Sequence, residues 1–294
     1  MTGVYESGID LAAVVAIDTH VHIEVGDDGR TALPPDLAEA ASTYFKTGGT
    51  VPTLDAIADF YRERQMAAVV FTVDAEFALG TPPISSIEVV EGAARNSDVL
   101  IPFASVDPHR ADAADLARVL VSEHGARGFK FHPTVQGFDP SDEQWFGLWQ
   151  VIDELGVPAL FHTGQTGIGA GTPGGHGLRL GLSNPILLDE VAAAFPSLTI
   201  VMAHPSVPWQ DEAISVATHK SNVYIDLSGW RPKYFPPQLV RAANSFLQDR
   251  VLFGSDFPLI SPDVWMTDFA DLGLKDTVRP KILKANAVTL LGLA

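Results

Sequence analysis

The sequence predicts a (β/α)₈ barrel, a closed ring of eight parallel strands surrounded by helices. Eight short apolar segments recur along the chain, and a helix-like segment lies between each consecutive pair of them. The length of 294 residues is slightly above that of a typical single barrel. Strands that alternate with helices on one continuous chain favour a closed barrel, with an open doubly wound sheet as the alternative.

The eight apolar segments are predicted strands. They are rich in Val, Ile, Leu and Phe with little polar alternation, as expected of parallel strands buried on both faces. The predicted strands are Val14–Asp18, Ala67–Val73, Val99–Val106, Gly128–His132, Pro158–His162, Leu198–Ala203, Val223–Leu227 and Val251–Gly254.

The intervals between the strands are predicted helices. Several begin with a capping residue or a first-turn proline, as at Ser183–Pro185. Several end on Gly or Asn, as at Gly125, Gly156 and Asn222. The predicted helices are Thr53–Arg64, Ile87–Asn96, Ala111–His124, Asp142–Leu155, Pro185–Phe195, Trp209–His219 and Pro237–Leu247.

No low-complexity linker divides the chain, so we expect a single domain over residues 1–294. The longest connection, Glu24–Pro52, follows the first strand and carries Gly, Pro and Asp. We expect it to be an insertion over the mouth of the barrel.

The composition excludes several classes of protein and of site. A formal net charge of −17 argues against nucleic acid and membrane as partners, since both need basic patches. The chain has no cysteine, so His and carboxylate side chains must hold any metal. No apolar run approaches the roughly 18 residues of a membrane helix, and the opening MTGVYESGID does not resemble a secretory signal. We therefore expect a cytoplasmic protein.

Histidines gather at the ends of the predicted strands, where the active sites of barrels lie. Six of the nine histidines stand there, whereas chance would scatter them; the alternative is that they are core or surface histidines with backbone partners. The six are His20, His22, His132, His162, His204 and, less tightly, His109.

A metal site is predicted from four of the strand-end residues. His20 and His22 are two residues apart, so they share one face of an extended strand and can reach one ion. His162 and Asp256, from the fifth and eighth strands, could complete a set of three nitrogens and one oxygen. Such a set suits a divalent catalytic metal.

Several segments extend this pattern over almost the whole chain: IDTHVHI, GFKFHPTVQ, ALFHTG, IVMAHPSVPW, NVYIDLSGW, VLFGSDFP and the closing LKANAVTLLGLA. In order and spacing they resemble the amidohydrolase superfamily, in its amidohydrolase-related branch that includes aminocarboxymuconate-semialdehyde decarboxylase. The resemblance implies that His20, His22, His162 and Asp256 bind a single Zn²⁺ or Mn²⁺, with Zn²⁺ expected first. It implies that His204 is a catalytic acid or base beside the metal, and that the protein forms a homodimer.

Two residues near this site have open roles. Binuclear members of the superfamily use a carboxylated lysine on the fourth strand, and Lys130 stands there. The Phe-His-Pro that follows resembles the mononuclear branch, which favours an anion-binding role for Lys130; the alternative is an ion pair with a carboxylate such as Asp107. Asp18 is two residues before His20 and should point the same way, either to orient a ligand or to cap the strand.

The loops contribute candidates for substrate binding. The glycine-rich loop 164–184 is predicted to be a mobile lid on which Arg179 meets a substrate carboxylate, with an ordinary exposed loop as the alternative. Three further side chains follow the sixth and seventh strands and are candidates for a pocket wall or for simple packing: Trp209, Trp230 and Arg231.

The expected chemistry follows from the metal. A divalent ion activates water and polarises a carbonyl; Asp256 could take a proton, and His204 could donate one or stabilise an oxyanion. We expect a hydrolase acting on a small, carboxylate-bearing substrate through a metal-bound water. Non-oxidative decarboxylation of an aromatic or muconate-type acid is the alternative, a hydratase or isomerase a third possibility, and a non-catalytic ligand-binding barrel a less favoured one.

Overall fold

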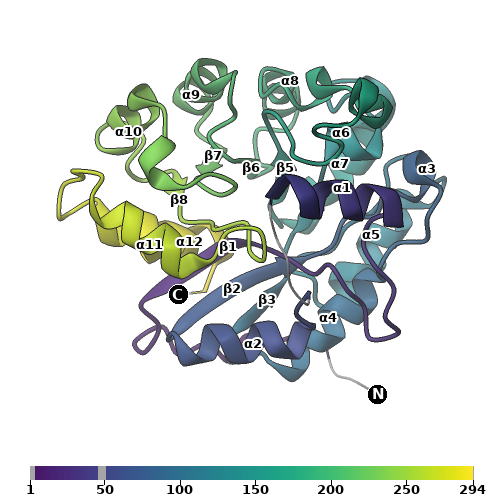
Figure 1. Ribbon diagram of the computed structural model, residues 1–294, viewed down its shortest axis with the longest axis horizontal. Coiled ribbons are helices and arrows are strands. Elements are labelled where there is room, and N and C mark those ends of the chain that lie inside the picture. The colour runs from purple at the N-terminus through teal and green to yellow at the C-terminus, as the bar shows by residue number, and fades with distance from the viewer. Residues whose placement is uncertain (1–3, 46–50, 294) are drawn as a thin grey trace.

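The computed structural model describes residues 4–45 and 51–293, and it contains the predicted parallel strands and surrounding helices. Figure 1 shows the strands in the middle of the molecule and most helices around them. The strands are β1 (Ala16–His22), β2 (Met66–Phe71), β3 (Leu100–Pro102), β4 (Phe129–Phe131), β5 (Ala159–His162), β6 (Ile200–Ala203), β7 (Val223–Asp226) and β8 (Val251–Leu252).

The strands close into a barrel, so the alternative of an open sheet is wrong. All neighbours pair in parallel, within β1–β3 and within β4–β8. Ala104 bridges to Phe129 between β3 and β4, and the Thr19 N–H donates to the Phe253 carbonyl oxygen at 2.9 Å between β1 and the end of β8. The (β/α)₈ fold predicted from the sequence is confirmed.

Two apolar layers support the barrel. One fills its interior with side chains such as Ile17, Val69 and Leu252, and the other lies between the strands and the helices, with Val70 and Phe161 as examples. Both layers consist of fully or nearly fully buried side chains. The uninterrupted apolar character of the strands therefore reflects burial on both faces.

A helix is present in each of the seven intervals that were predicted to hold one. The Thr53 hydroxyl caps the first of them by accepting a hydrogen bond from the Ala56 N–H. These helices are α2 (Leu54–Glu63), α4 (Ser86–Arg95), α5 (Ala113–Ser122), α7 (Phe146–Leu155), α8 (Leu187–Ala194), α9 (Gln210–His219) and α10 (Pro237–Ala243).

Further helices were not predicted. They are α1 (Pro35–Phe45), α3 (Glu76–Leu79), α6 (Pro133–Gln136), α11 (Pro262–Ala270) and α12 (Asn286–Leu291), together with 3₁₀ turns Pro173–Gly177, Leu180–Ser183 and Pro232–Tyr234 and a π-helical turn Lys281–Ala285. A further 3₁₀ turn, Glu143–Trp145, forms the start of the predicted helix Asp142–Leu155. Helix α1 lies in the long connection after β1, in front of the strands in Figure 1. Residues 46–50 of that connection lie outside the described residues.

A β-bulge in β1 determines which of its side chains face the barrel interior. The pairing of β1 with β2 shifts between Asp18 and Val21. This extra residue reverses the alternation of side chains. Ile17 points into the interior before the bulge, and His20 and His22 meet inside the barrel mouth after it.

No helix within residues 4–45 and 51–293 is long and apolar enough to cross a membrane.

Candidate active site

Three of the four predicted metal ligands lie together at the carboxyl ends of the strands. The Nε2 atoms of His20 and His22 are 3.2 Å apart. Asp256 Oδ1 lies 3.3 Å from the first of these nitrogens and 3.1 Å from the second. The Asp256 backbone N–H donates to the His20 carbonyl oxygen at 2.9 Å, which holds the loop after β8 against β1.

A buried carboxylate that was not predicted, Asp226 at the end of β7, orients His20. Asp226 Oδ2 lies 2.9 Å from His20 Nδ1. The carboxylate therefore accepts a hydrogen bond from Nδ1–H and leaves the Nε2 lone pair directed at His22 and Asp256. A carboxylate behind a metal-binding imidazole is the usual arrangement in metal sites. The signal in the sequence was the acidic residue next to the end of the predicted strand Val223–Leu227. Roles were predicted for Asp18 and Asp256 at other strand ends but none for Asp226.

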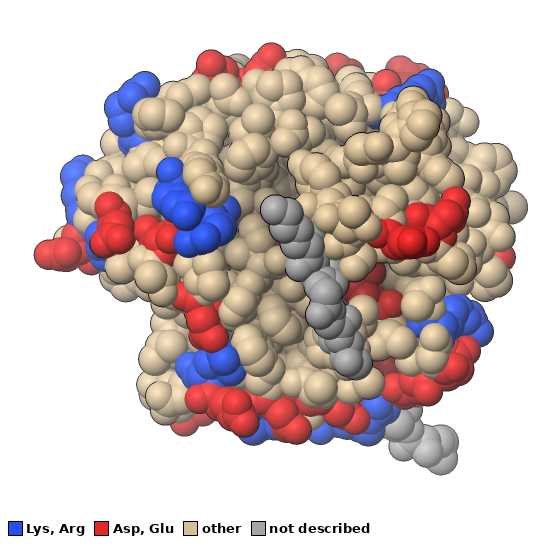
Figure 2. Space-filling model, viewed as in Figure 1, with Lys and Arg blue, Asp and Glu red and all other residues tan. Residues whose placement is uncertain are grey.

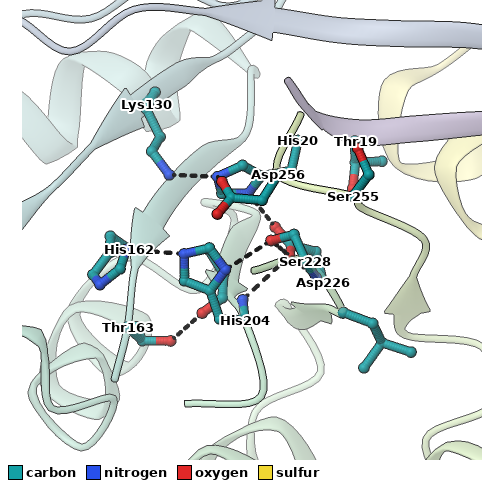
Figure 3. Close-up of polar contacts among 12 residues, drawn as sticks. Thr19, His20, Lys130, His162, Thr163, His204, Asp226, Ser228, Ser255 and Asp256 are labelled. Carbon is teal, nitrogen blue, oxygen red and sulfur yellow. Dashed lines mark hydrogen bonds and ion pairs between the residues drawn. The ribbon is translucent and has the colours of Figure 1, made fainter. Parts of the chain in front are cut away.

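A second chain of hydrogen bonds joins the ends of β5, β6 and β7 (Figure 3). His162 Nδ1 lies 2.9 Å from His204 Nε2, and His204 Nδ1 lies 2.9 Å from the Ser228 hydroxyl, which donates to Asp226. This direction of donation makes Nδ1 the protonated nitrogen of His162. Its Nε2 then carries a lone pair, and that buried atom has no hydrogen-bond partner within the described part of the chain.

The donor atoms fit a divalent metal ion. Two imidazole nitrogens and a carboxylate oxygen converge at His20, His22 and Asp256, and His162 Nε2 is a buried donor without a partner. Burial lowers the pKa of His20 and of His162 well below the usual range, which keeps both rings in the neutral form that binds metals. Two three-residue groups of converging donors occur among the described residues, His20, His22 and Asp256 and also His20, His204 and Asp226. His162 is in neither group, so its part as a ligand stays a prediction.

The carboxyl group of Asp256 is held ionised. Burial alone would raise its pKa, but a hydrogen bond from His22 and the nearby His20 and His204 rings outweigh that effect and lower it below the usual range. Asp256 and His204 both have a positive φ of 73°, a conformation that side-chain-bearing residues rarely adopt and that is frequent at functional sites.

Lys130 of β4 reaches the same cluster. Its side chain is fully buried, its Nζ lies 3.1 Å from His20 Nε2, and it lies over the Phe71 ring. Burial lowers the pKa of Lys130 to about 8, although Asp226 and Asp256 act in the opposite direction. Asp107 is not that partner in the described part of the chain, because its carboxylate contacts His109 and the Phe77 N–H and its own N–H donates to Asp74. Whether Lys130 binds an anion or serves as the structural partner of another barrel carboxylate, such as Asp226 or Asp256, stays a prediction.

The expectation for the direction of Asp18 is also wrong. The bulge turns its carboxyl group away from the ligand cluster, where it accepts hydrogen bonds from the Tyr61 hydroxyl at 2.7 Å and the Ser255 N–H at 2.9 Å. Asp18 also accepts from the His20 N–H at 3.1 Å. It thus joins β1, α2 and the loop that carries Asp256, and a positioning role for it stays a prediction.

A cavity of about 800 Å³ lies over the cluster. Its floor contains two of the three clustered ligand residues, His22 and Asp256, together with His132, His162 and His204. Its walls come from α1 and from the loops after β5, β7 and β8. Most wall residues are apolar: Ile23, Ala32, Leu33, Ala38, Ala41, Phe45, Val51, Leu79, Val135, Ile168, Trp230 and Leu259. Figure 2 shows that charged side chains lie mainly away from the middle of this face, which is hollowed.

Some of the predicted substrate-binding residues line this cavity and others do not. Arg231 lines it, but the guanidinium makes two hydrogen bonds to Asp268, at 2.7 and 2.9 Å. Arg179 is exposed and lines a smaller neighbouring cavity, and Trp209 precedes α9 outside both linings. Substrate binding by these three residues stays a prediction.

Gly229 is required by the packing of His204. A Cβ at Gly229 would lie 2.4 Å from His204 Nδ1, and the residue has a φ of 72°. Gly229→Ala should therefore lower the free energy of unfolding by about 1–2 kcal/mol for the backbone conformation and by a further roughly 1–3 kcal/mol for the clash. Gly273→Ala is the matched control, because Gly273 has a φ of 62° and open space around it. Urea unfolding of both variants checks this, and equal losses would contradict the role of the His204 contact.

The chain belongs to the amidohydrolase family. The amidohydrolase-2 family model, described as amidohydrolase, matches residues 17–293. No curated protein sequence matches the chain.

Solved structures share the barrel. An uncharacterised TIM-barrel protein from Bordetella bronchiseptica aligns with a TM-score of 0.75 at 22% identity, over 94% of this chain and 98% of that one. A dihydroxybenzoic acid decarboxylase from Polaromonas, solved with manganese and 2-nitroresorcinol, aligns with a TM-score of 0.65 at 18% identity, over 95% and 97%. A probable 2-pyrone-4,6-dicarboxylic acid hydrolase from Acinetobacter baumannii, with citric acid bound, aligns at 0.60 and 15%, over 95% and 100%. At these identities the likeness supports the fold alone.

Proposed function

We propose that the protein is a metal-dependent decarboxylase that releases CO₂ from a small aromatic carboxylic acid without oxidation. The observation that carries this proposal is the composition of the cavity, in which apolar walls stand over a floor of histidines and Asp256. Lys130 lies buried behind that floor, with its Nζ 3.1 Å from His20 Nε2. Apolar walls suit an aromatic ring and leave the floor to hold its polar substituents. The only arginine in the described lining, Arg231, is already paired with Asp268, so the walls offer no free guanidinium for a second carboxylate.

The residues that would hold the metal are His20, His22, Asp256 and His162. An imidazole-rich set with one carboxylate favours Zn²⁺, and the manganese in the decarboxylase from Polaromonas keeps Mn²⁺ as a second choice. When bound, such an ion supplies positive charge that attracts the substrate carboxylate and a neighbouring oxygen.

The side chains of this chain supply the rest of the reaction. Loss of CO₂ breaks a carbon–carbon bond and leaves the electron pair on the ring carbon, which must take up one proton. Asp256 belongs to the ligand cluster and also lines the cavity. Because it is held ionised, we propose that it first takes a proton from water or from a substrate hydroxyl and then passes that proton to the ring carbon. The apolar walls exclude water around the substrate carboxylate, and Lys130 adds positive charge beneath it.

Hydrolysis, expected first from the sequence, is the second candidate. The ionised state of Asp256 favours it, because a carboxylate beside the ligand cluster can accept a proton from water. The probable hydrolase among the structural neighbours supports it as well. The decarboxylase is preferred because several of the structural neighbours carry that name and the cavity has apolar walls.

The test combines a substrate panel with metal removal. Protein loaded with Zn²⁺ or Mn²⁺ is incubated with 2,6-dihydroxybenzoate, 2,3-dihydroxybenzoate and 5-carboxyvanillate, and separately with 2-pyrone-4,6-dicarboxylate and simple lactones. We expect CO₂ and the decarboxylated phenol from one of the acids, loss of at least 90% of this activity after chelation (roughly 10-fold or more), and recovery on adding the metal. Ring opening of the lactones without CO₂ release would favour the hydrolase, and activity that survives complete metal removal would exclude both.

A further inference from the structure

His132, at the end of β4, lies in the floor of the cavity but is not in either group of converging metal donors among the described residues. Its side chain is buried and stacks on His162, with ring centroids 3.8 Å apart and ring planes within 9° of each other. The backbone is fixed as well, because the His132 N–H donates to Gln136 Oε1 at 2.7 Å and Gln136 in turn donates to the Asp74 carbonyl oxygen at 2.7 Å. The ring is thus held in one position beside a predicted metal ligand.

The hydrogen bonds of His132 determine which of its nitrogens carries the proton. The imidazole caps α6, because Nδ1 accepts a hydrogen bond from the Val135 backbone N–H at 3.4 Å. A backbone N–H can only donate, so Nδ1 has no proton and the neutral ring carries it on Nε2. A protonated Nε2 cannot bind a metal, but it can donate a hydrogen bond.

The Nε2–H of His132 is nearly unused. In the described part of the chain, the hydrogen-bond partner of Nε2 is the Thr166 hydroxyl oxygen, which lies 3.5 Å away, at the outer limit for a hydrogen bond. That oxygen already accepts a hydrogen bond from the Ile168 N–H at 3.1 Å. Thr166 and Ile168 both line the cavity, so the donor faces the space that a substrate would fill.

We propose that His132 is a substrate-binding residue whose Nε2–H donates a hydrogen bond to an oxygen of the substrate, either its carboxylate or an adjacent hydroxyl or phenolate. This inference rests on the proposed function, because it takes the ligand to be a small aromatic acid. The neutral ring recognises an oxygen lone pair by direction, whereas Lys130 provides charge without direction. His132 thereby selects acids that carry an acceptor oxygen on the side of the pocket opposite the loop after β8.

Two substitutions separate substrate binding from helix capping. In His132→Asn, the side-chain oxygen can replace Nδ1 as the cap of α6, since Asn is a good N-cap, but nothing reaches the position of Nε2. In His132→Gln, the longer amide can place an N–H near that position while the cap is lost. Both variants are loaded with Zn²⁺, and metal content, thermal unfolding and the affinity for 2,6-dihydroxybenzoate are measured by titration calorimetry.

We expect His132→Asn to keep the wild-type metal content and unfolding temperature while its affinity for the acid falls about 10-fold or more, the effect of losing a hydrogen bond to a charged group. His132→Gln should unfold at a lower temperature yet lose less affinity than His132→Asn. Nitrogen NMR of the histidine rings should find the proton of His132 on Nε2.

Several results would overturn the proposal. If His132→Asn binds the acid as tightly as wild type, His132 is only a helix cap, and the proposed decarboxylase function is unaffected. If NMR finds the proton on Nδ1, Nε2 has no hydrogen to donate, and the proposal fails whichever substrate is used. If wild-type protein neither binds nor decarboxylates any acid of the panel, the proposed function fails, and the role of His132 fails with it.

Discussion

Replacement of Asp256 with Asn is expected to lower turnover about 10³-fold or more while the barrel stays folded. The substitution keeps the shape of the side chain and the backbone hydrogen bond to His20, but it removes the negative charge and the ability to carry a proton. It also replaces an oxygen that lies within 3.3 Å of both His20 Nε2 and His22 Nε2. Turnover of the best substrate by metal-saturated protein, beside a thermal unfolding curve, measures the effect.

The metal content of this variant distinguishes two explanations for a loss of activity. If Asp256→Asn binds metal at saturating concentration and still fails to turn over, the carboxylate acts on the substrate as well as on the metal. If activity returns fully at high metal concentration, its part is that of a ligand alone. Turnover within about 3-fold of wild type would contradict both roles, since loss of either would cost far more.

The second large effect is expected from Asp226→Asn, which should weaken metal binding by about 10–100-fold. Asp226 is fully buried and accepts hydrogen bonds from His20 Nδ1, from the backbone N–H groups of His204 and Ser228, and from the Ser228 hydroxyl. An amide group there must place N–H against at least one of these donors. If His20 moves its proton from Nδ1 to Nε2 in response, its Nε2 lone pair is lost.

Asp107→Asn is the matched control for Asp226→Asn. Asp107 is equally buried in the loop after β3, accepts hydrogen bonds from the backbone N–H groups of Phe77 and His109, and lies 2.9 Å from His109 Nδ1. It does not belong to either group of converging donors in the described chain. Competition with a chelating dye should show weaker Zn²⁺ binding in Asp226→Asn and wild-type binding in Asp107→Asn, and an equal loss in both would point to general destabilisation.

The barrel could be predicted from the sequence because its strands are buried on both faces. Such strands are continuous runs of apolar residues, whereas a strand with one face in water alternates apolar and polar residues. Element bounds were less accurate. The segment Val99–Val106 was predicted as one strand, whereas β3 covers Leu100–Pro102 and the pairing beyond it is reduced to the isolated bridge of Ala104 with Phe129. Helix α1 was missed because it lies in the long connection Glu24–Pro52, which was predicted as an insertion without helices, and Leu37 is the one residue of PDLAEAASTYF that is fully buried.

The sequence predicted correctly those site residues whose positions depend only on lying at the end of a strand. His20, His22 and Asp256 come together because the carboxyl ends of parallel strands in a barrel share one side. The direction of Asp18 was predicted wrongly because a bulge is a feature of pairing between strands, which one strand's sequence does not reveal. Asp226 was overlooked because a lone Asp at a strand end also serves commonly as a cap.

The structure of one chain does not test several of the other predictions. A homodimer, a cytoplasmic location and a single domain over residues 1–294 stay predictions. The choice between Zn²⁺ and Mn²⁺ also stays a prediction, because both ions accept nitrogen and oxygen donors at similar distances.

The ligand set and the wall of the cavity are carried by separate stretches of chain. The metal-binding side chains stand on strand ends that the whole barrel holds in place, whereas Phe45 and its neighbours on α1 reach the cavity from a connection outside the ring. Phe45 packs so closely on Gly167 that a Cβ there would lie 2.2 Å from the ring, so α1 and the loop after β5 must change together. Relatives can therefore diverge in the compounds they accept by paired substitutions in these two segments, while the reactive centre is inherited unaltered.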